Sequence, residues 1–283
     1  MTRTDDSPAL LSEEGVLELK GPPADTRIYY GNDLLQFGDL YLPKSDGPHP
    51  TVIFIHGGMW LGDIDIAHSA KLCAALANNG IAVWSLEYRR VGNPGGGWPG
   101  TFQDINQGAD HLSTIAAEYK LDMDRVLIMG HSAGGHLALW LAARSSLPAD
   151  TLVSANSPLQ VRGVLGMAAV ADLASIHQID FAQEVIEGLV GGSPEQYPEN
   201  YQLADPIHLQ APSDLPQVLL NGKYDDDWGA FGITYFKCAK ERGDNIRFIE
   251  APECGHFDMM NPDLSTWSMV LEAVLTMLVK VTK

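Results

Sequence analysis

The sequence predicts an α/β protein with a mostly parallel central sheet and helices on both of its faces. Short, continuous apolar runs rich in β-branched residues recur along the chain, as in strands that are buried on both faces. Segments with apolar residues at helical spacing alternate with these runs. The chain has 283 residues, 45% of them hydrophobic, so it is long enough to bury a large core.

The charge balance excludes two classes of partner. A formal net charge of -18 repels nucleic acid backbones and anionic membrane surfaces. The first twenty residues have neither the pattern of a signal peptide nor that of a transit peptide, and no apolar run reaches the roughly 18 residues of a membrane span. We therefore expect a soluble, cytoplasmic protein that binds a small molecule.

The cysteines indicate neither a disulfide framework nor a zinc site. Cys73, Cys238 and Cys254 are odd in number, far apart and without a CxxC pair. Histidine, cysteine and aspartate do not cluster at ligand spacing elsewhere, so we expect no metal and no cofactor. The sequence leaves the oligomeric state open, with a homodimer as one option.

The first elements are predicted from alternation and turn residues. Residues 1–25 are expected to be a loose segment, and residues 26–283 a single domain. From Thr26, apolar and polar residues alternate around Gly31-Asn32-Asp33, which predicts an antiparallel hairpin. The apolar run 51–56 predicts the first buried strand, and the pattern over 64–79 predicts a helix that ends at Asn79-Gly80.

The later elements keep the same alternation. After the strand at 81–88, a Gly- and Pro-rich loop covers 91–100. Further strands are predicted at 125–129, 161–170, 216–222 and 245–251, and further helices at 104–119, 133–144, 229–242 and 264–279. Residues 172–212 interrupt this rhythm with a short helix at 180–189 and Gly/Pro-rich turns, which predicts a small lid or pocket wall.

The most informative motif lies between a predicted strand and a predicted helix. Gly130-His131-Ser132-Ala133-Gly134 has the form Gly-x-Ser-x-Gly at that junction. A serine hydroxyl is a weak nucleophile, so it needs a tight turn that exposes it beside a helix N-terminus. The glycines allow the strand and the helix to approach each other. The motif predicts Ser132 as a nucleophile.

A base and an acid follow in the order that such a sheet requires. Asp225 comes soon after the strand at 216–222, and His256 follows the strand at 245–251. Asp225 is the preferred acid because it is nearest the strand end, and Asp226 is the alternative. We expect His256 to take the proton of Ser132 and the aspartate to orient the imidazole.

Negative charge that develops on a carbonyl oxygen needs backbone N–H donors that are already in place. Ala133 offers one donor at the start of the helix after Ser132. Gly57 and Gly58 follow the first buried strand and allow a close backbone approach. These three residues are the predicted oxyanion donors.

The combination resembles the α/β-hydrolase superfamily. Residues 56–60, HGGMW, match the HGGxW signature of its kynurenine formamidase and small carboxylesterase branch, close to the hormone-sensitive lipase-like esterases. The resemblance extends from about Tyr29 to the C-terminus and includes GHSAGGHLA at 130–138. It implies the α/β-hydrolase fold, and it places the family's triad and oxyanion donors on Ser132, Asp225, His256, Gly57, Gly58 and Ala133.

Two neighbours of the glycines bear on substrate binding. Met59 replaces a third glycine and would narrow the pocket, and Trp60 follows it. Trp60, Trp98 and Phe257 could form an aromatic pocket, with packing in the core or a lid as the equal alternative. His56 is interpreted as an anchor of the glycine loop and not as a base.

These residues predict a serine hydrolase that cleaves a small carboxylic ester through an acyl-enzyme intermediate. An arylformamidase, which cleaves an N-formyl aromatic amide of the N-formylkynurenine type, is the alternative within the same chemistry. A non-catalytic ligand-binding protein on the same fold is the alternative from another class.

Overall fold

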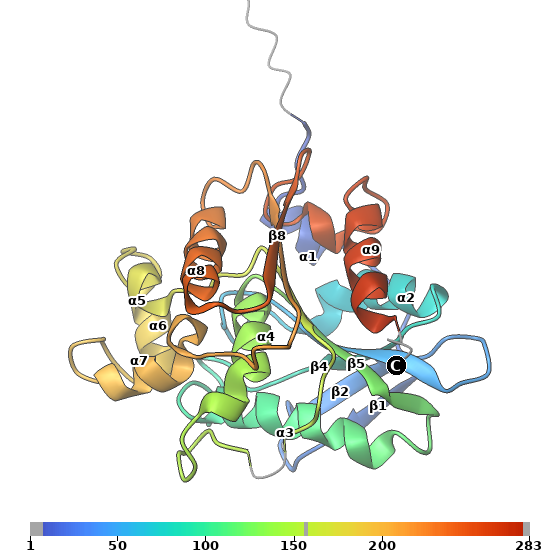
Figure 1. Ribbon diagram of the computed structural model, residues 1–283, viewed down its shortest axis with the longest axis horizontal. Helices are drawn as coiled ribbons and strands as arrows, with labels where there is room; N and C mark the ends of the chain where they lie inside the picture. Colours follow the sequence, from blue (N-terminus) through green and yellow to red (C-terminus); the bar gives the residue numbers. More distant parts are fainter. Residues whose placement is uncertain (1–7, 156–157, 280–283) are drawn as a thin grey trace, which may run out of the picture.

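The computed structural model describes residues 8–155 and 158–279, and the strands in this part of the chain form one sheet (Figure 1). The strand order is β1-β2-β4-β3-β5-β6-β7-β8. The strand bounds are β1 Thr26–Tyr29, β2 Phe37–Tyr41, β3 His49–Ile55, β4 Ala82–Leu86, β5 Leu121–His131, β6 Val164–Met167, β7 Gln217–Gly222 and β8 Ile246–Ala251.

The sheet is parallel from β4 to β8, with an antiparallel hairpin at one edge. β1 pairs with β2 and β2 pairs with β4, both antiparallel, whereas β3 pairs with β4 and with β5 in parallel. In the centre, Val52 lies opposite Val83 on one side and Leu127 on the other. This arrangement confirms the predicted α/β class with a mostly parallel sheet.

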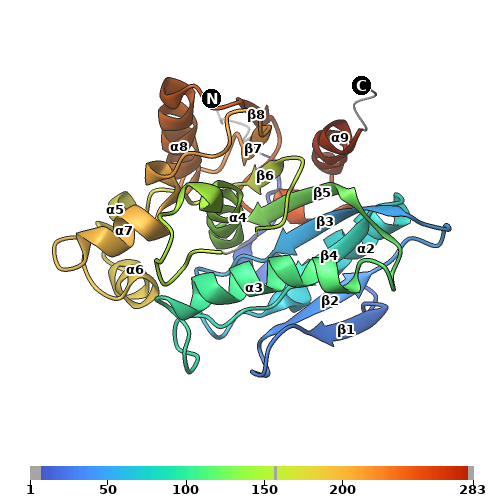
Figure 2. The same cartoon turned by 60° about the horizontal axis from the view of Figure 1, so that its bottom comes forward.

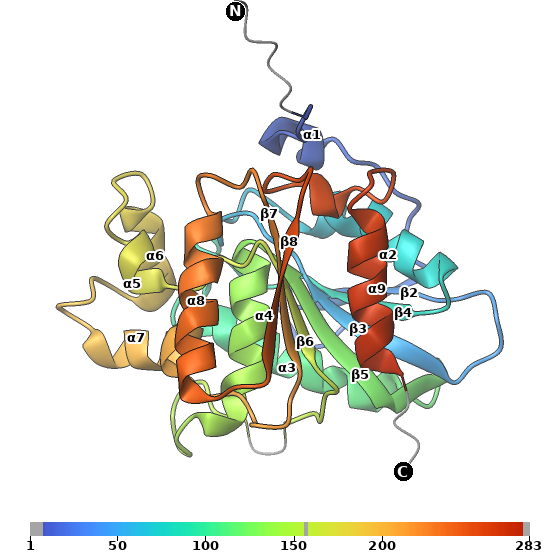
Figure 3. The same cartoon turned by 45° about the horizontal axis from the view of Figure 1, so that its top comes forward.

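Two apolar cores cover the two faces of the sheet, and the side chains of β3 alternate between them. Ile53 and Ile55 point into one core, and Val52 and Phe54 into the other. Such double burial explains why this strand reads as a continuous apolar run. Figure 3 shows α2 and α9 on one side of the sheet and α4 and α8 on the other.

The helices that pack on the sheet lie close to the predicted ranges. Their bounds are α2 Ala70–Asn78, α3 Gly100–Ile115, α4 Ala133–Ala143, α8 Gly229–Arg242 and α9 Trp267–Leu278. Figure 2 brings α3 to the front, where it crosses the sheet beside β4. All eleven residues of α4 are buried, which fits its apolar composition on every side.

The insertion at 172–212 contains more helix than its sequence predicts. The predicted helix at 180–189 is α6 Gln183–Val190, and it lies between α5 Leu173–Ile176 and α7 Pro198–Ala204. Both additional helices are too short to give a periodic apolar pattern. Asp172 caps α5 by accepting a hydrogen bond from the Ser175 N–H, a local signal that periodicity does not capture.

The N-terminal segment differs from the loose segment expected over residues 1–25. Helix α1 covers Glu13–Leu17, and the Ser12 side chain caps it by accepting from the Gly15 N–H. Val16 is buried, so this segment packs on the body of the protein. The segment packs in this way because it contains a few apolar side chains, such as Val16, within a polar stretch. Residues 1–7 lie outside the described residues.

In the part of the chain that the structure describes, every helix is too short or too polar to cross a bilayer. The three cysteines are free thiols, two of them buried, and burial raises the pKa of Cys73 to about 12. Within residues 8–155 and 158–279, no group of three or more histidine, cysteine, aspartate or glutamate side chains is arranged to hold a metal ion.

Candidate active site

Ser132 lies at a sharp turn between β5 and α4. Its φ is 54° and its ψ is -120°, a strained backbone for a residue with a side chain. The flanking glycines make the turn possible, because a Cβ on Gly130 would collide with the carbonyl oxygen of Gly134. A Cβ on Gly134 would collide with the carbonyl oxygen of Ile55. The packing of the strand against the helix therefore holds the serine in this conformation.

A chain of two hydrogen bonds joins the three side chains predicted to react. The Nε2 atom of His256 lies 2.9 Å from the Oγ of Ser132, and its Nδ1 lies 2.8 Å from Oδ2 of Asp225. All three side chains are buried. They come from loops at the carboxyl ends of β5, β7 and β8, which meet at one edge because these strands are parallel.

The aspartate that pairs with His256 is Asp225, and not the alternative Asp226. The second oxygen of Asp225 accepts a hydrogen bond from the Trp228 N–H at 3.2 Å, which fixes the carboxylate. Asp226 and Asp227 are exposed. The position nearest the strand end is thus the one that turns inward.

The glycine loop after β3 lies directly against the serine. A Cβ on Gly57 would lie 3.2 Å from the Cβ of Ser132. Gly58 has a φ of 110°, and Met59 and Trp60 also have positive φ values. The ring Nδ1–H of His56 donates to the Gly57 carbonyl oxygen at 2.8 Å, as expected of a loop anchor. The structure thus brings Gly57 and Ala133 to the same turn as Ser132.

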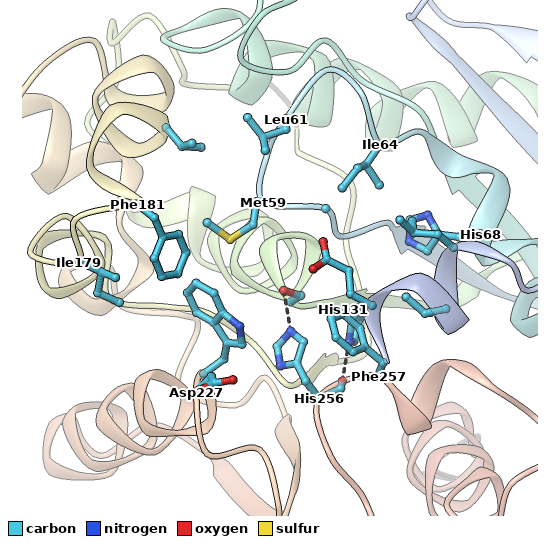
Figure 4. A pocket seen from close by; sticks show the side chains of 17 residues that line it. Met59, Leu61, Ile64, His68, His131, Ile179, Phe181, Asp227, His256 and Phe257 are labelled. Carbon is cyan, nitrogen blue, oxygen red and sulfur yellow. Dashed lines mark hydrogen bonds between the residues drawn. The ribbon is translucent and has the colours of Figure 1, made fainter. Parts of the chain in front are cut away.

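A pocket of about 640 Å³ opens over Ser132 and His256 (Figure 4). Met59 lines it, as predicted from its place in the loop, and so does Phe257. Its other lining residues include Gly58, Leu61, Ile64, His68, His131, Ile179, Phe181, Val185, Asp227 and Trp228. The lining is mainly apolar, which suits a small neutral group.

Trp60 and Trp98 do not line this pocket, so for both residues the structure favours core packing over the aromatic pocket. Trp60 is fully buried, with its ring 5.3 Å from that of His136. Trp98 packs against Phe102 at 5.4 Å. Both tryptophans therefore pack in the core, which is the alternative to an aromatic pocket. Trp228 also lines the pocket, although no motif in the sequence indicates it; it follows Asp225–Asp227 and packs edge-on against Phe181 at 5.8 Å.

Residues 38–227 match the BD-FAE family model, which is about two thirds of the chain. The chain belongs to the BD-FAE family. It is 29% identical to isoprenylcysteine alpha-carbonyl methylesterase ICME of Arabidopsis thaliana over 203 residues. These aligned residues cover 68% of this chain and 46% of that protein. It is also 23% identical to esterase LipC of Mycobacterium tuberculosis over 252 residues, and this alignment covers 83% of this chain and 60% of LipC. The chain thus spans about half the length of these relatives.

Solved structures confirm the α/β-hydrolase fold of this BD-FAE chain. Esterase B from Lactobacillus rhamnosis superimposes with a TM-score of 0.78 at 23% identity, covering 93% of this chain and 89% of the esterase. A truncated carbohydrate esterase from gut microbiota superimposes with a TM-score of 0.77 at 22% identity, covering 92% of this chain and 100% of that esterase. The narrower assignment to the HGGxW branch stays a prediction.

His131 supports the backbone of the loop that carries His256, in a way that the motif did not reveal. Its Nε2–H donates to the carbonyl oxygen of His256 at 2.8 Å. Burial and the neighbouring His256 hold the pKa of His131 well below its usual range, so this ring is neutral. His131 therefore fixes the loop that carries His256 without adding charge. It occupies a variable position of Gly-x-Ser-x-Gly, which gives no signal in one sequence.

A buried ionic network lies under the glycine loop of this BD-FAE protein. The Glu87 carboxylate is bonded to His56 Nε2 at 3.1 Å and to Arg90, and it accepts from the Ile66 N–H at 3.2 Å. Burial by itself would raise the pKa of Glu87, but its interactions with His56 and Arg90 hold this pKa below its usual value. The network fixes the conformation of His56 and hence of the loop.

We expect Glu87→Gln to lower the free energy of unfolding by about 3 kcal/mol, because it leaves the buried Arg90 guanidinium without its counter-charge. Urea denaturation measures this change. The matched control is Asp39→Asn, which breaks an ion pair with the half-exposed Arg27 and should cost less than about 1 kcal/mol. Equal losses in the two variants would contradict the role of this network.

The insertion that carries one side of the pocket is pinned by a buried carboxylate. Asp205 accepts hydrogen bonds from the Leu173 N–H at 2.6 Å and the Ile207 N–H at 3.2 Å. Burial raises the pKa of Asp205 to about 7, and its backbone hydrogen bonds only partly oppose this. The folded protein therefore holds this proton up to a higher pH than the unfolded chain does.

By itself, the raised pKa of Asp205 should lower the free energy of unfolding as the pH rises from 4 to 7, whereas the lowered pKa values of His68 and His131 act in the opposite direction. The raised pKa of Asp205 contributes stability that is complete below about pH 4 and is lost as the pH rises to about 7, on the order of 4 kcal/mol. Asp205→Asn removes this titration, so the difference in unfolding free energy between wild type and variant should decrease over that range. A difference independent of pH would contradict the shifted pKa.

Proposed function

We propose that this BD-FAE protein is a serine hydrolase that cleaves a small carboxylic ester through an acyl-enzyme intermediate. The observation that carries the proposal is the hydrogen-bonded chain from Ser132 through His256 to Asp225. The names of its relatives, a methylesterase and an esterase, support the same class of reaction.

The hydrogen bonds define the role of each side chain. Because ionised Asp225 accepts from Nδ1–H of His256, the lone pair of Nε2 faces the Ser132 hydroxyl. His256 takes the proton as Oγ attacks the ester carbonyl carbon, and it returns the proton to the departing alkoxide. Water then attacks the acyl-enzyme by the same route and releases the carboxylic acid.

The negative oxygen of each tetrahedral intermediate requires donors beside Ser132. The N–H of Ala133 lies at the start of α4, and the Gly57-Gly58 segment lies against the serine. Each such donor lowers the barrier by about 3 kcal/mol in serine hydrolases. We assign the oxyanion site to these three residues.

The pocket supports a neutral substrate of modest size. Its volume of about 640 Å³ and its lining by Met59, Phe181, Trp228 and Phe257 favour an apolar acyl or alcohol group. No observation favours the N-formyl amide over an ester, so the arylformamidase alternative is retained only as an outcome of the experiment.

The experiment compares kcat/KM for 4-nitrophenyl acetate, butyrate and octanoate with that for N-formylkynurenine. The proposal predicts ester hydrolysis that exceeds turnover of the amide. Faster turnover of the amide would make the protein an arylformamidase. Absence of turnover on every ester would overturn the proposal, and absence of turnover on the amide as well would favour a non-catalytic binding protein.

A further inference from the structure

The N-terminal segment 8–17 is attached to the loop that carries His256. The buried Asp258 carboxylate accepts the Leu11 N–H on Oδ1 at 3.0 Å and the Gly255 N–H on Oδ2 at 2.8 Å. One side chain thus joins the N-terminal segment to the backbone next to His256. This link connects residues that are far apart in the sequence.

Apolar packing reinforces this attachment. Val16 is 3% exposed and belongs to the same core as Met259, against which Phe257 also packs. Leu10 lies against Gly255, where an added Cβ would meet its Cδ1 at 3.1 Å. Four residues after α1, Gly21 passes so close to the backbone of α2 that a side chain there would collide with it.

The same segment lines the pocket over the serine. Glu13, Val16 and Leu17 contribute to its wall together with Ser132 and His256. Figure 4 shows that the pocket extends to both sides of His256. We name these sides the Phe181 arm, with Ile179 and Phe181, and the His68 arm, with Ile64, His68 and Phe257.

Helix α1 borders the His68 arm. It packs against the 3₁₀ helix Ile66–Ser69, which contains His68. Leu17 is 45% exposed, so its side chain lies at the edge of the pocket and a larger side chain can extend into it. Burial lowers the pKa of His68 to about 4, so this ring is neutral at pH 7. Glu13 therefore brings a negative charge of α1 to the His68 arm, whose named residues Ile64, His68 and Phe257 are apolar or neutral.

We propose that residues 8–17 form a fixed wall of the substrate pocket, in which Leu17 limits the length of the ester group that enters the His68 arm. This inference rests on the proposed esterase function. It also makes Asp258 a positioning residue, because the same carboxylate holds the wall and the backbone next to His256.

The test is Leu17→Trp in the full chain, which adds volume at the edge of the arm. We measure kcat/KM with 4-nitrophenyl acyl esters from acetate to octanoate and with alkyl acetates from methyl to octyl. In one series, kcat/KM for the longest ester should fall about tenfold or more relative to kcat/KM for the shortest ester. In the other series, the dependence of kcat/KM on chain length should stay as in the wild type. Leu152→Trp, at an exposed leucine outside the pocket lining, should change neither series.

A conservative variant covers the case in which Leu17→Trp does not fold. Glu13→Gln should raise kcat/KM for an ester that bears a carboxylate, relative to its neutral isostere, by about two- to fivefold at low salt. Glu14→Gln is the matched control, because Glu14 lies on the same helix, is exposed and is not among the lining residues.

The possible results distinguish a failure of the proposed pocket wall from a failure of the proposed esterase function. An active enzyme whose folded Leu17→Trp variant keeps the wild-type profile in both series would overturn the wall and leave the esterase function intact. The same holds if that variant does not fold and Glu13→Gln behaves like Glu14→Gln. A wild type that hydrolyses no ester would instead overturn the proposed function itself.

Discussion

Replacing Ser132 with alanine is expected to lower kcat for 4-nitrophenyl butyrate by about 10⁵- to 10⁶-fold. The variant keeps the turn and the pocket but has no Oγ to attack the ester carbonyl. His256 then has no hydroxyl within hydrogen-bond distance to activate. A spectrophotometric assay at enzyme concentrations high enough to record the residual rate measures the effect.

Ser146→Ala is the matched control for this loss. Ser146 is an exposed serine whose hydroxyl donates to the Ala143 carbonyl oxygen, and it lies outside the pocket lining. It should keep wild-type kcat. A Ser132→Ala protein that is folded and retains more than about a tenth of wild-type activity would show that another group is the nucleophile.

Replacing Asp225 with asparagine is expected to lower kcat by about 10⁴-fold with little change in fold. An asparagine amide can donate to Nδ1 of His256, which favours the ring tautomer with its proton on Nε2. That tautomer cannot accept the proton of Ser132. The measurement is kcat for the same ester, together with circular dichroism to confirm that the variant is folded.

The neighbouring aspartates supply two controls of identical chemistry. Asp226 and Asp227 are exposed and make no hydrogen bond to His256 within the described residues, so Asp226→Asn and Asp227→Asn should stay near wild-type kcat. Asp226→Asn is the stricter control, because Asp227 also lines the pocket. A loss confined to Asp226→Asn would mean that the loop after β7 reorients when substrate binds, and would contradict the assignment of Asp225.

The strands and the order of the site residues could be predicted because the physics behind them is local. The centre of a strand buried on both faces must be apolar, as residues 52–55 are, and a parallel sheet carries its loops to one edge. Gly130 and Gly134 are dictated by contacts with the backbone a few ångströms away. These constraints leave clear traces in a single sequence.

The pocket could not be predicted in the same way, because its walls come from distant parts of the chain. Trp60 lies beside the glycine loop in sequence, yet its side chain is buried against His136. Phe181 and Trp228 meet across two loops. Helix α1 has only five residues and is held by Asp258, more than 240 residues later. Such contacts have no periodic signature.

The most direct test of the account is covalent labelling of the protein with a fluorophosphonate, followed by peptide mass spectrometry. The hydrogen bonds from Ser132 to His256 and on to Asp225 predict one adduct per chain, on the peptide that contains Ser132. Labelling should disappear in Ser132→Ala and persist in Ser146→Ala. An enzyme that hydrolyses esters but is not labelled at Ser132, or is labelled at another residue, would contradict the central claim.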